Sequence, residues 1–250
     1  MRDAITRGER GRWLAAGLIS ALAIGIGGLG WLAESDTRDT RTAEAGTITV
    51  EDWSEQPSGR VGIPSGWEAQ GRGGKCDLRI EELADGGVAQ RVLHLVSDND
   101  NCLISKRVGR IDVNEYPILR WRWKAVTLPT GGDSRRAATD DQAAQIYLAF
   151  PRFPAAVRSR IIGYVWDSTA PAGGVFKSAS LGLVTYVIVR SGPGELGQWI
   201  TETRNVREDF TRLYGEGPRE LVEAVTIGID SNDTKSRAES YVGEIQFRRP

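Results

Sequence analysis

The chain has 250 residues with 32 Lys and Arg against 33 Asp and Glu, and this balance lacks the basic character of nucleic-acid-binding domains. Its one histidine, His94, excludes zinc sites that use several imidazoles and any Ser-His-Asp triad not built on this residue. Thirty glycines and ten prolines are typical of many short strands joined by turns. We therefore expect a β-rich fold and no nucleic-acid partner.

Residues 1–12 form a mildly basic segment, and residues 13–33 follow without a charged side chain. A stretch of this length can span the roughly 30 Å hydrocarbon core of a bilayer. The sequence therefore predicts a single-pass anchor in the inner membrane, with its basic end in the cytoplasm and the remaining chain in the periplasm. A signal segment that is cleaved after export, which would leave a secreted protein, is the alternative.

Residues 34–46 are polar and lack apolar periodicity, which is typical of a linker. We place one periplasmic domain at 47–250, beginning with a strand at 47–53, since about 200 residues are enough for a single β-sandwich core. The two cysteines, Cys76 and Cys102, are too few for a metal ribbon. We expect them to form a disulfide in an oxidising compartment, with two separate buried thiols as the alternative.

Three further strands are predicted at 77–83, 88–97 and 102–108. The residues at 84–87 have the composition of a hairpin turn. Asp and Asn alternate at 98–101, where they favour a turn because their side chains bond to the nearby backbone. The same oxygen atoms could hold Ca²⁺, but we favour the turn.

The clearest alternation of apolar and polar residues lies between residues 118 and 150. Two strands are predicted there, at 118–124 and 140–150, each with one apolar face. The apolar faces should point into one core, which we also expect to hold most of the tryptophans. The polar faces carry Arg120, Arg122 and Lys124 in the first strand, and Asp141, Gln145 and Tyr147 in the second.

Apolar runs predict more strands at 161–167, 181–190, 198–205, 221–230 and 241–247. Between the strands at 198–205 and 221–230, helical spacing at 206–214 followed by Gly215 predicts one short helix. The expected fold class is therefore all-β: a two-sheet antiparallel β-sandwich of jelly-roll type with one short helix, in addition to the N-terminal membrane helix.

Strand parity collects polar side chains on one predicted open face, which we expect to bind a ligand. Its residues are Arg122, Asp141, Gln145, Tyr147, Asp167, Arg190, Glu202 and Arg204. The strand at 198–205 is ambiguous, because Glu202 and Arg204 share a face with Ile200, whereas Trp199 shares a face with Thr201. Arg, Asp and Gln side chains can bond sugar hydroxyls. The alternative is a network of ion pairs on a solvated sheet.

No catalytic residue is assigned from the sequence. If the protein is an enzyme, two of Asp141, Asp167 and Glu202 would form the carboxylate pair of a polysaccharide hydrolase or lyase. We favour a binding module, because nothing in the sequence sets the separation of such a pair.

Oxygen-bearing side chains at Asp230, Asn232 and Asp233 are candidates for a structural Ca²⁺ site. The segment lacks the glycine of an EF-hand loop, so a polar hairpin is favoured. No other cofactor is expected.

A series of motifs occurs in a fixed order along the domain: LRWRWK at 119–124, DDQAAQIY at 140–147, YVWD at 164–167, VRSG at 189–192, WITETRNV at 199–206 and IDSNDT at 229–234. Together they resemble an uncharacterised family of exported bacterial proteins, domain of unknown function 3047. The resemblance covers about residues 47–247 and leaves out the N-terminal segment. It implies a location in the bacterial envelope and a β-sandwich similar to galactose-binding and carbohydrate-binding domains, and it supplies no catalytic residue.

The function we expect is that of an exported, membrane-tethered β-sandwich module whose partner is a glycan or another cell-envelope component. A carbohydrate-active enzyme with a carboxylate pair is one alternative. An envelope scaffold that binds another protein is a second, and a large exposed apolar patch would favour it.

Overall fold

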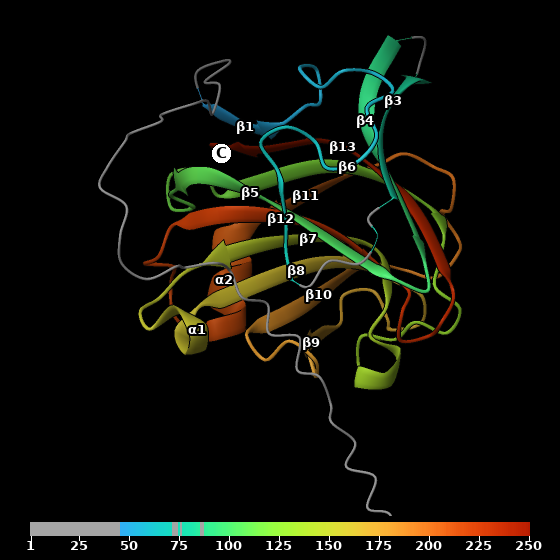
Figure 1. Cartoon of the computed structure of the whole chain (residues 1–250). Helices are drawn as coiled ribbons and strands as arrows, with labels where there is room; N and C mark the ends of the chain where they lie inside the picture. Colours follow the sequence, from blue (N-terminus) through green and yellow to red (C-terminus); the bar gives the residue numbers. More distant parts are fainter. Residues whose placement is uncertain (1–45, 72–74, 76, 86–87) are drawn as a thin grey trace, which may run out of the picture.

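The computed structural model describes residues 46–71, 75, 77–85 and 88–250, which form two β-sheets packed face to face (Figure 1). The predicted basic segment, the anchor or signal segment and nearly all of the linker lie outside the described residues. None of the helices in the described part of the chain is long and apolar enough to cross a membrane.

The six-stranded sheet has the order β11-β6-β13-β4-β3, and β1 pairs with β13 beside β4. Its strands are β1 (Thr47–Glu51), β3 (Asp77–Asp85), β4 (Val88–Asp98), β6 (Ile118–Thr127), β11 (Ile200–Asn205) and β13 (Arg237–Arg248). The last strand, β13, holds this sheet together, because it pairs with β1 and β4 along one edge and with β6 along the other. The C-terminus therefore lies beside the first strand (Figure 1).

The seven-stranded sheet has the order β2-β5-β12-β7-β8-β10-β9. Its strands are β2 (Glu68–Ala69), β5 (Asn101–Ile111), β7 (Gln142–Phe150), β8 (Arg160–Asp167), β9 (Val175–Lys177), β10 (Val184–Ser191) and β12 (Val222–Asp230). The pair β8–β10 is parallel, so the prediction of a purely antiparallel sandwich is wrong here. The connection that contains β9 carries the chain back to the start of β8, and such a crossover makes parallel pairing possible.

The predicted helix is confirmed as α2 (Val206–Tyr214). Asn205 caps it by accepting a hydrogen bond from the backbone N–H of Glu208 at 3.2 Å, and Gly215 ends it with a φ of 72°. Two helical segments are missed by the prediction of a single helix: the 3₁₀ turn Ala137–Thr139 and α1 (Ala155–Arg158). Both are too short to produce a helical period in the sequence.

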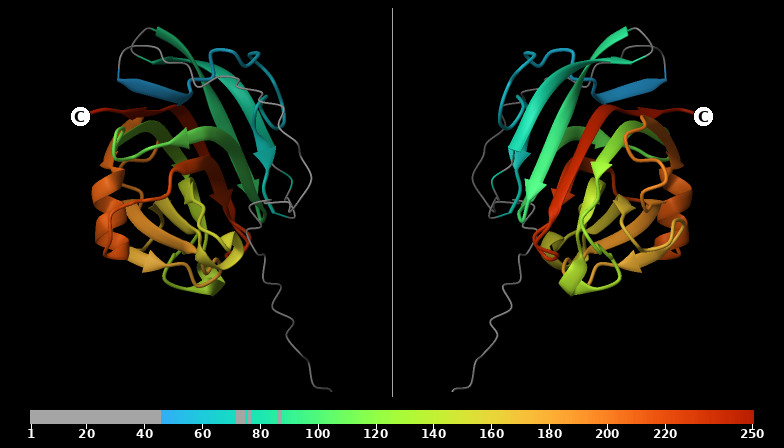
Figure 2. Two further views of the ribbon diagram at one scale, coloured as in Figure 1. Left: turned by 90° about the vertical axis from the view of Figure 1, so that its left-hand side faces the viewer. Right: turned by 90° about the vertical axis from the view of Figure 1, so that its right-hand side faces the viewer.

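The core lies between the sheets and is rich in aromatic rings. Trp121 and Trp123 of β6 are fully buried, as the alternation predicts. Tyr164 and Trp166 of β8 approach them from the other sheet, with ring centroids 5.3 Å apart for Trp121 and Tyr164, and 6.0 Å apart for Trp123 and Trp166. Burying one large apolar side chain contributes about 1.5–3 kcal/mol. Figure 2 shows the two layers from the sides.

The seven-stranded sheet also buries side chains on its outer side, which the sequence predicts to be open. Tyr147 and Tyr186 lie on that side and are 4% and 2% exposed. Phe176 of β9 and Leu181 in the following loop pack against this outer cluster. The prediction fails because strand parity indicates which face a residue occupies but does not indicate what covers that face.

Cys102 of β5 is disulfide-bonded. Its predicted partner, Cys76, lies outside the described residues. The jelly-roll assignment stays a prediction.

Candidate ligand-binding site

The outer side of the six-stranded sheet carries the polar half of β6. Arg120, Arg122 and Lys124 are partly exposed there, because every second residue of this strand is buried in the core. Tyr241 of β13 and His94 of β4 share this side, since they are cross-strand neighbours of Lys124 and of each other. This surface holds the candidate site.

A row of four side chains crosses the strands on this surface, and we call it the aromatic row: Trp199, Lys124, Tyr241 and His94. Lys124 pairs with Tyr241, which in turn pairs with His94. Trp199 comes directly before β11, the neighbour of β6, and its ring lies next to Lys124. Sheet pairing therefore joins residues that are far apart in the chain.

Lys124 lies between the two larger rings of the aromatic row. Its Nζ is 4.2 Å from the ring centroid of Tyr241 and 5.2 Å from that of Trp199. Cation–π contacts of this kind contribute roughly 0.5–1 kcal/mol each at exposed sites. Among the residues that the structure describes, no carboxylate forms an ion pair with this ammonium group.

His94 forms the other end of the aromatic row. Its ring stacks on Tyr241 with centroids 4.3 Å apart and planes 6° apart. Its Nδ1 is 2.8 Å from Glu81 and its Nε2 is 3.0 Å from Glu239. Only an imidazolium can donate to both carboxylates, since the neutral ring has one N–H. Burial, and then the charges of Glu81 and Glu239, raise the pKa of Tyr241, so its hydroxyl stays protonated.

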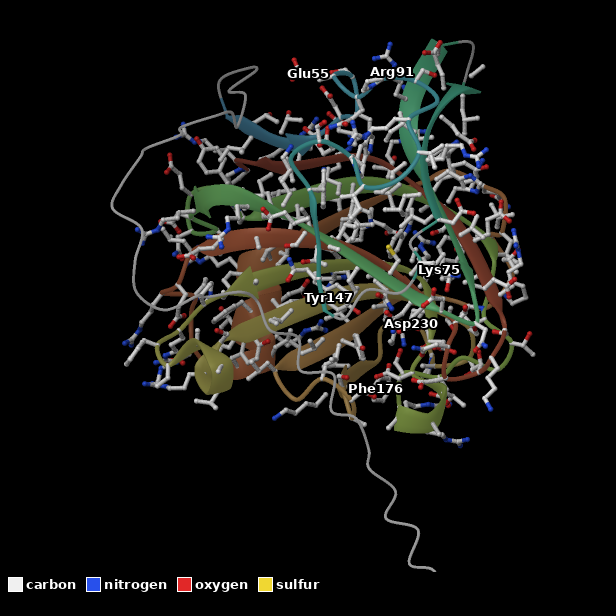
Figure 3. The ribbon with its side chains drawn as sticks, viewed as in Figure 1. Glu55, Lys75, Arg91, Tyr147, Phe176 and Asp230 are labelled. Carbon is white, nitrogen blue, oxygen red and sulfur yellow. The ribbon has the colours of Figure 1, made fainter. Side chains whose placement is uncertain are left out.

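A groove of about 630 Å³ lies beside the aromatic row, near the end of the β3–β4 hairpin. This volume is in the range of sites that hold small ligands. Arginines, carboxylates and one amide line the groove: Arg91, Arg120, Arg122, Asp52, Glu82, Glu244 and Gln90. Figure 3 labels Arg91 in this part of the molecule.

Ion pairs hold Arg120 and Arg91 at the groove. Arg120 Nη1 is 3.3 Å from Glu244, and Arg91 Nε is 3.5 Å from Glu82. Arg91 also donates to the backbone carbonyl of Ser54 at 2.6 Å, which attaches the segment after β1 to the groove. Exposed pairs of this kind contribute about 0–1 kcal/mol to stability. They keep several hydrogen-bonding groups in place around one hollow.

Arg122 connects the groove to the aromatic row. Its Nη1 donates to Gln90 Oε1 in the groove at 2.7 Å, and its Cζ is 5.1 Å from the ring centroid of Trp199. Gly243 of β13 leaves room for this arrangement. A Cβ at that position would lie 3.3 Å from Cβ of Arg122 and 3.7 Å from the Trp199 ring.

The structure resolves the parity of β11, which the sequence leaves open. Glu202 and Arg204 pair with core-facing residues of β6, so they lie on the inner side of the sheet, together with Ile200. The set that contains Trp199 lies on the outer side with Arg122. The prediction that Glu202 and Arg204 share an open face with Arg122 is therefore wrong.

Elements at the edge of the sandwich are instead joined by Glu202, Arg190 and Arg204. Arg190 of β10 donates to Glu202 Oε1 at 2.7 Å, and Trp123 Nε1 donates to the same oxygen at 3.2 Å. Arg204 Nε donates to Asp209 of α2 at 2.9 Å. These contacts link β10, β11, β6 and α2, and they indicate a structural role.

Asp141 is fully buried and does not face a ligand-binding surface. Its carboxylate accepts hydrogen bonds from the backbone N–H groups of Asp233 and Thr234 at 3.2 and 2.6 Å. It therefore holds the turn between β12 and β13. This contradicts its predicted place on an open ligand face.

Asp167 is likewise fully buried. It accepts hydrogen bonds from the backbone N–H groups of Ser134, Thr169 and Ala170 at 2.8, 2.7 and 2.6 Å. Its carboxylate fixes two loops at the end of β8. Asp141, Asp167 and Glu202 are thus each engaged in separate structural contacts, and the structure lends no support to a catalytic carboxylate pair among them.

Gln145 and Tyr147 lie on the outer side of β7, as predicted, but they are buried, at 2% and 4% exposed. Figure 3 shows Tyr147 and Asp230 on the seven-stranded sheet. Gln145 Nε2 donates to Gln142 at 2.6 Å, whereas Gln145 Oε1 has no hydrogen-bond partner in the described part of the protein. Gly228 of β12 makes room for this side chain, because a Cβ there would lie 2.1 Å from Gln145 Oε1.

Two carboxyl groups beside these residues have raised pKa values. Burial raises the pKa of Asp140 to about 6, against the opposing effect of hydrogen bonds that begins with Gln142. Burial, and then the charge of Asp141, raise the pKa of Asp230 to about 9. These groups form a buried polar layer in which Asp230 is neutral at pH 7.

The metal candidates Asp230, Asn232 and Asp233 lie at the end of β12 and in the turn that follows it. Within the described ranges, no group of three or more His, Cys, Asp or Glu side chains could hold a metal ion. Burial, and then Asp141, raise the pKa of Asp233 as well. The segment forms a turn between β12 and β13. These two strands belong to different sheets, so the predicted hairpin is wrong.

All four residues of the aromatic row are absent from the predicted ligand face, although Lys124 lies on the predicted polar face of the strand at 118–124. Trp199 belongs to the parity set that the sequence analysis leaves as an alternative. His94 and Tyr241 lie in predicted strands, but no local pattern shows that these two strands pair with each other or that the strand of Tyr241 pairs with β6. The alternation at 118–124 is the one sequence signal that leads to this surface.

Comparison with known proteins identifies a family by sequence. A family model described as "Protein of unknown function (DUF3047)" matches residues 79–246. No curated protein matches the chain.

Solved structures give distant likenesses. A family 11 carbohydrate-binding module of the cellulase Lic26A-Cel5E of Clostridium thermocellum is 9% identical with a TM-score of 0.43, over 83% of this chain and 97% of the module. A family 30 carbohydrate-binding module of Cel9D-Cel44B of the same organism is 10% identical with a TM-score of 0.42, over 81% and 97%. The K2 adhesin domain of Lys-gingipain is 13% identical with a TM-score of 0.43, over 82% and 98%. Likenesses at these scores carry no argument about function.

Proposed function

The chain belongs to the DUF3047 family, and from its own geometry we propose that it is a β-sandwich module that binds a glycan on the outer side of the six-stranded sheet. The observation that carries the proposal is the aromatic row next to a groove of about 630 Å³. The row and the groove lie on one surface and are connected through Arg122.

The chemistry of this surface suits a sugar. A pyranose has apolar C–H faces that can lie against an aromatic ring, and it has hydroxyl groups that need donors and acceptors around its rim. Trp199 and Tyr241 supply partly exposed rings. Arg122, Gln90 and Glu244 supply donors and acceptors along the adjoining groove. The arrangement lets a chain of sugars contact rings and polar groups together.

We propose further that the domain acts in the periplasm, tethered to the inner membrane by residues 13–33, or that it is secreted after cleavage. The uncharged segment supports this, and so does the disulfide at Cys102, because disulfides persist mainly in oxidising compartments. In spheroplasts that express the full chain, added protease should digest the domain. Protection of the domain in intact spheroplasts would contradict export.

Loss of the Trp199 ring tests the proposed function. The full chain, purified in detergent, is screened on a glycan array, and the affinity for a positive glycan is measured by calorimetry. Trp199→Ala should weaken binding about tenfold, because it removes a ring contact worth roughly 1–1.5 kcal/mol. Phe153→Ala is the matched control, since Phe153 is 87% exposed and lies near α1, outside the candidate site.

Two outcomes would contradict the proposal. The first is that no glycan on the array binds to the folded protein. The second is that a glycan binds and that Trp199→Ala and Phe153→Ala leave its affinity equally unchanged. Thermal unfolding of both variants controls for loss of structure.

The scaffold alternative finds no support on the described surface. The large apolar side chains exposed there are Val61, Phe153, Val157 and Val175, which come from three separate segments. A large contiguous apolar patch would have favoured that alternative.

A further inference from the structure

We infer that the glycan bound on the six-stranded sheet is acidic, with a carboxylate or a sulfate on its sugar rings. The inference rests on the proposed function and adds the chemical class of the ligand. It concerns the end of the aromatic row where Lys124 and Arg122 meet Trp199.

The first observation behind this inference is the charge of Lys124 and its surroundings. On the same surface Arg120 pairs with Glu244, and Arg91 lies beside Glu82. Lys124 instead lies against two rings, and none of the described carboxylates is its partner. Aromatic rings stabilise the positive charge, but its N–H donors bond most strongly to anions. A ligand that carries an acidic group would supply the missing anion.

A second cation lies at the same ring. Arg122 Cζ and Lys124 Nζ are 5.1 and 5.2 Å from the centroid of Trp199. A sugar that contacts Trp199 would therefore place its ring substituents near both groups. A guanidinium binds carboxylate and sulfate in a planar, bidentate manner, and an ammonium adds a compact point charge.

The acidic residues of the row lie at its other end. Glu81 and Glu239 are engaged by the two ring nitrogens of His94. Burial alone would raise the pKa of Glu239, but the hydrogen bonds from Arg237 and His94 outweigh it, so the pKa is lowered and the group stays ionised. The carboxylates of the row thus lie at the His94 end, whereas the Lys124 ammonium lies beside Trp199. An acidic sugar fits the first end.

The test compares three trisaccharides on the full chain in detergent: a galacturonic-acid trisaccharide, its carboxyl-reduced neutral counterpart, and a sulfated galactose trisaccharide. Short probes avoid the general affinity of charged polymers. The wild-type protein should bind at least one acidic probe about tenfold more tightly than the neutral one. The affinity should fall with added salt, because screening weakens exposed charge contacts. The two acidic probes distinguish carboxylate from sulfate.

Lys124→Gln should weaken binding of the acidic probe much more than binding of the neutral probe, and so remove most of the preference. Lys124→Arg should keep the preference, which shows that charge rather than packing is responsible. Lys177→Gln is the matched control, since Lys177 is an exposed lysine of β9 on the other sheet.

Equal binding of acidic and neutral probes, with no effect of Lys124→Gln, would overturn the inference and leave the proposed function standing. A preference that Lys124→Gln retains would also overturn it, because the anion would then lie elsewhere. If neither these probes nor any glycan on the array binds, the inference and the proposed function fail together.

Discussion

Asp141 shows that a polar side chain with suitable strand parity need not bind a ligand. It faces away from solvent and holds the backbone of the turn between β12 and β13. Lys124 and Trp199 are the opposite case, because they remain partly exposed on a surface with a groove. At the scale of single residues, burial and hydrogen-bond partners distinguish structural polar residues from candidate ligand-binding residues.

Replacing Asp141 by alanine should destabilise the fold. The change removes the carboxylate that accepts hydrogen bonds from the backbone N–H groups of Asp233 and Thr234, and a hydrogen bond to a charged group contributes about 1.5–3 kcal/mol. We expect a loss of about 2 kcal/mol or more in urea unfolding. Asp141→Asn, which keeps one acceptor oxygen, should lose less. Asp98→Ala, at an exposed position, serves as control; equal stability of Asp141→Ala and this control would contradict the assigned role.

Asp230 should make the stability depend on pH. Its pKa of about 9 in the folded protein lies above the ordinary value of 3.8, so the folded state binds more protons between these two values. The stability contribution of Asp230 is therefore full below about pH 4 and is lost as the pH rises toward 9. One such group changes the free energy of unfolding by at most about 1.4 kcal/mol per pH unit.

Urea unfolding at pH 6, 7 and 8 measures this effect. Asp140, with a pKa of about 6, titrates around the lower end of this range, so the change between pH 7 and pH 8 reports Asp230 most directly. Other titratable groups around Asp230 are Asp233, Asp141, Tyr147 and Tyr186. The stability of the wild type should fall with pH, and Asp230→Asn should show a flatter profile. Asp98→Asn should follow the wild type; a wild-type slope in Asp230→Asn would refute the prediction.

At the scale of elements, the two faces of each strand have different neighbours. These neighbours determine at which glycines a larger side chain would clash. Gly228 of β12 faces Gln145 on the outer side of the seven-stranded sheet. Gly243 of β13 faces Arg122 and Trp199 on the outer side of the other sheet. Both glycines keep a strand close to a large polar or aromatic side chain of its neighbour.

Gly228→Ala should destabilise the protein by about 1–3 kcal/mol, the usual cost of overfilling a packed site. The new Cβ would lie 2.1 Å from Gln145 Oε1 and 2.5 Å from Leu103 Cδ2, so neighbouring side chains must move. Thermal or urea unfolding measures the loss. Gly217→Ala is the matched control, because a Cβ there meets nothing within 4 Å. Comparable stability of the two variants would show that the strand has room for a methyl group.

At the scale of the whole molecule, the two sheets are held together by the aromatic core and by contacts at their edges. The ion pairs of Arg190 with Glu202 and of Arg204 with Asp209 bring β10, β11 and α2 together. Breaking one partner of a partly buried pair leaves a charge without compensation. The polar residues that the sequence suggests as ligands therefore contribute to assembly of the sandwich.

The disulfide at Cys102 should contribute to global stability. Disulfides typically add about 2–4 kcal/mol, mainly by restricting the unfolded chain. Cys102→Ser should lower the free energy of unfolding by this amount in the absence of reductant. Under reducing conditions the wild type should fall to the level of the variant, and the variant should not change. A wild type that keeps its stability after complete reduction would refute the prediction.

The sequence by itself determined the all-β class, the helix α2 and the buried faces of β6 and β8. These features follow from local alternation and capping, which depend on residues close together in the chain. It also determined the family, through motifs such as LRWRWK and IDSNDT.

Only the tertiary structure decided which strands are neighbours and which faces remain open. The aromatic row exists because β6 pairs with β11 and β13, and β13 with β4, and these pairings depend on packing between distant parts of the chain. For the same reason Tyr147 is buried while Trp199 is partly exposed, although both lie on polar faces of amphipathic strands. The face on which a side chain lies follows from its position in the strand. Coverage of the outer side of the seven-stranded sheet by β9 and its loops depends on the whole fold.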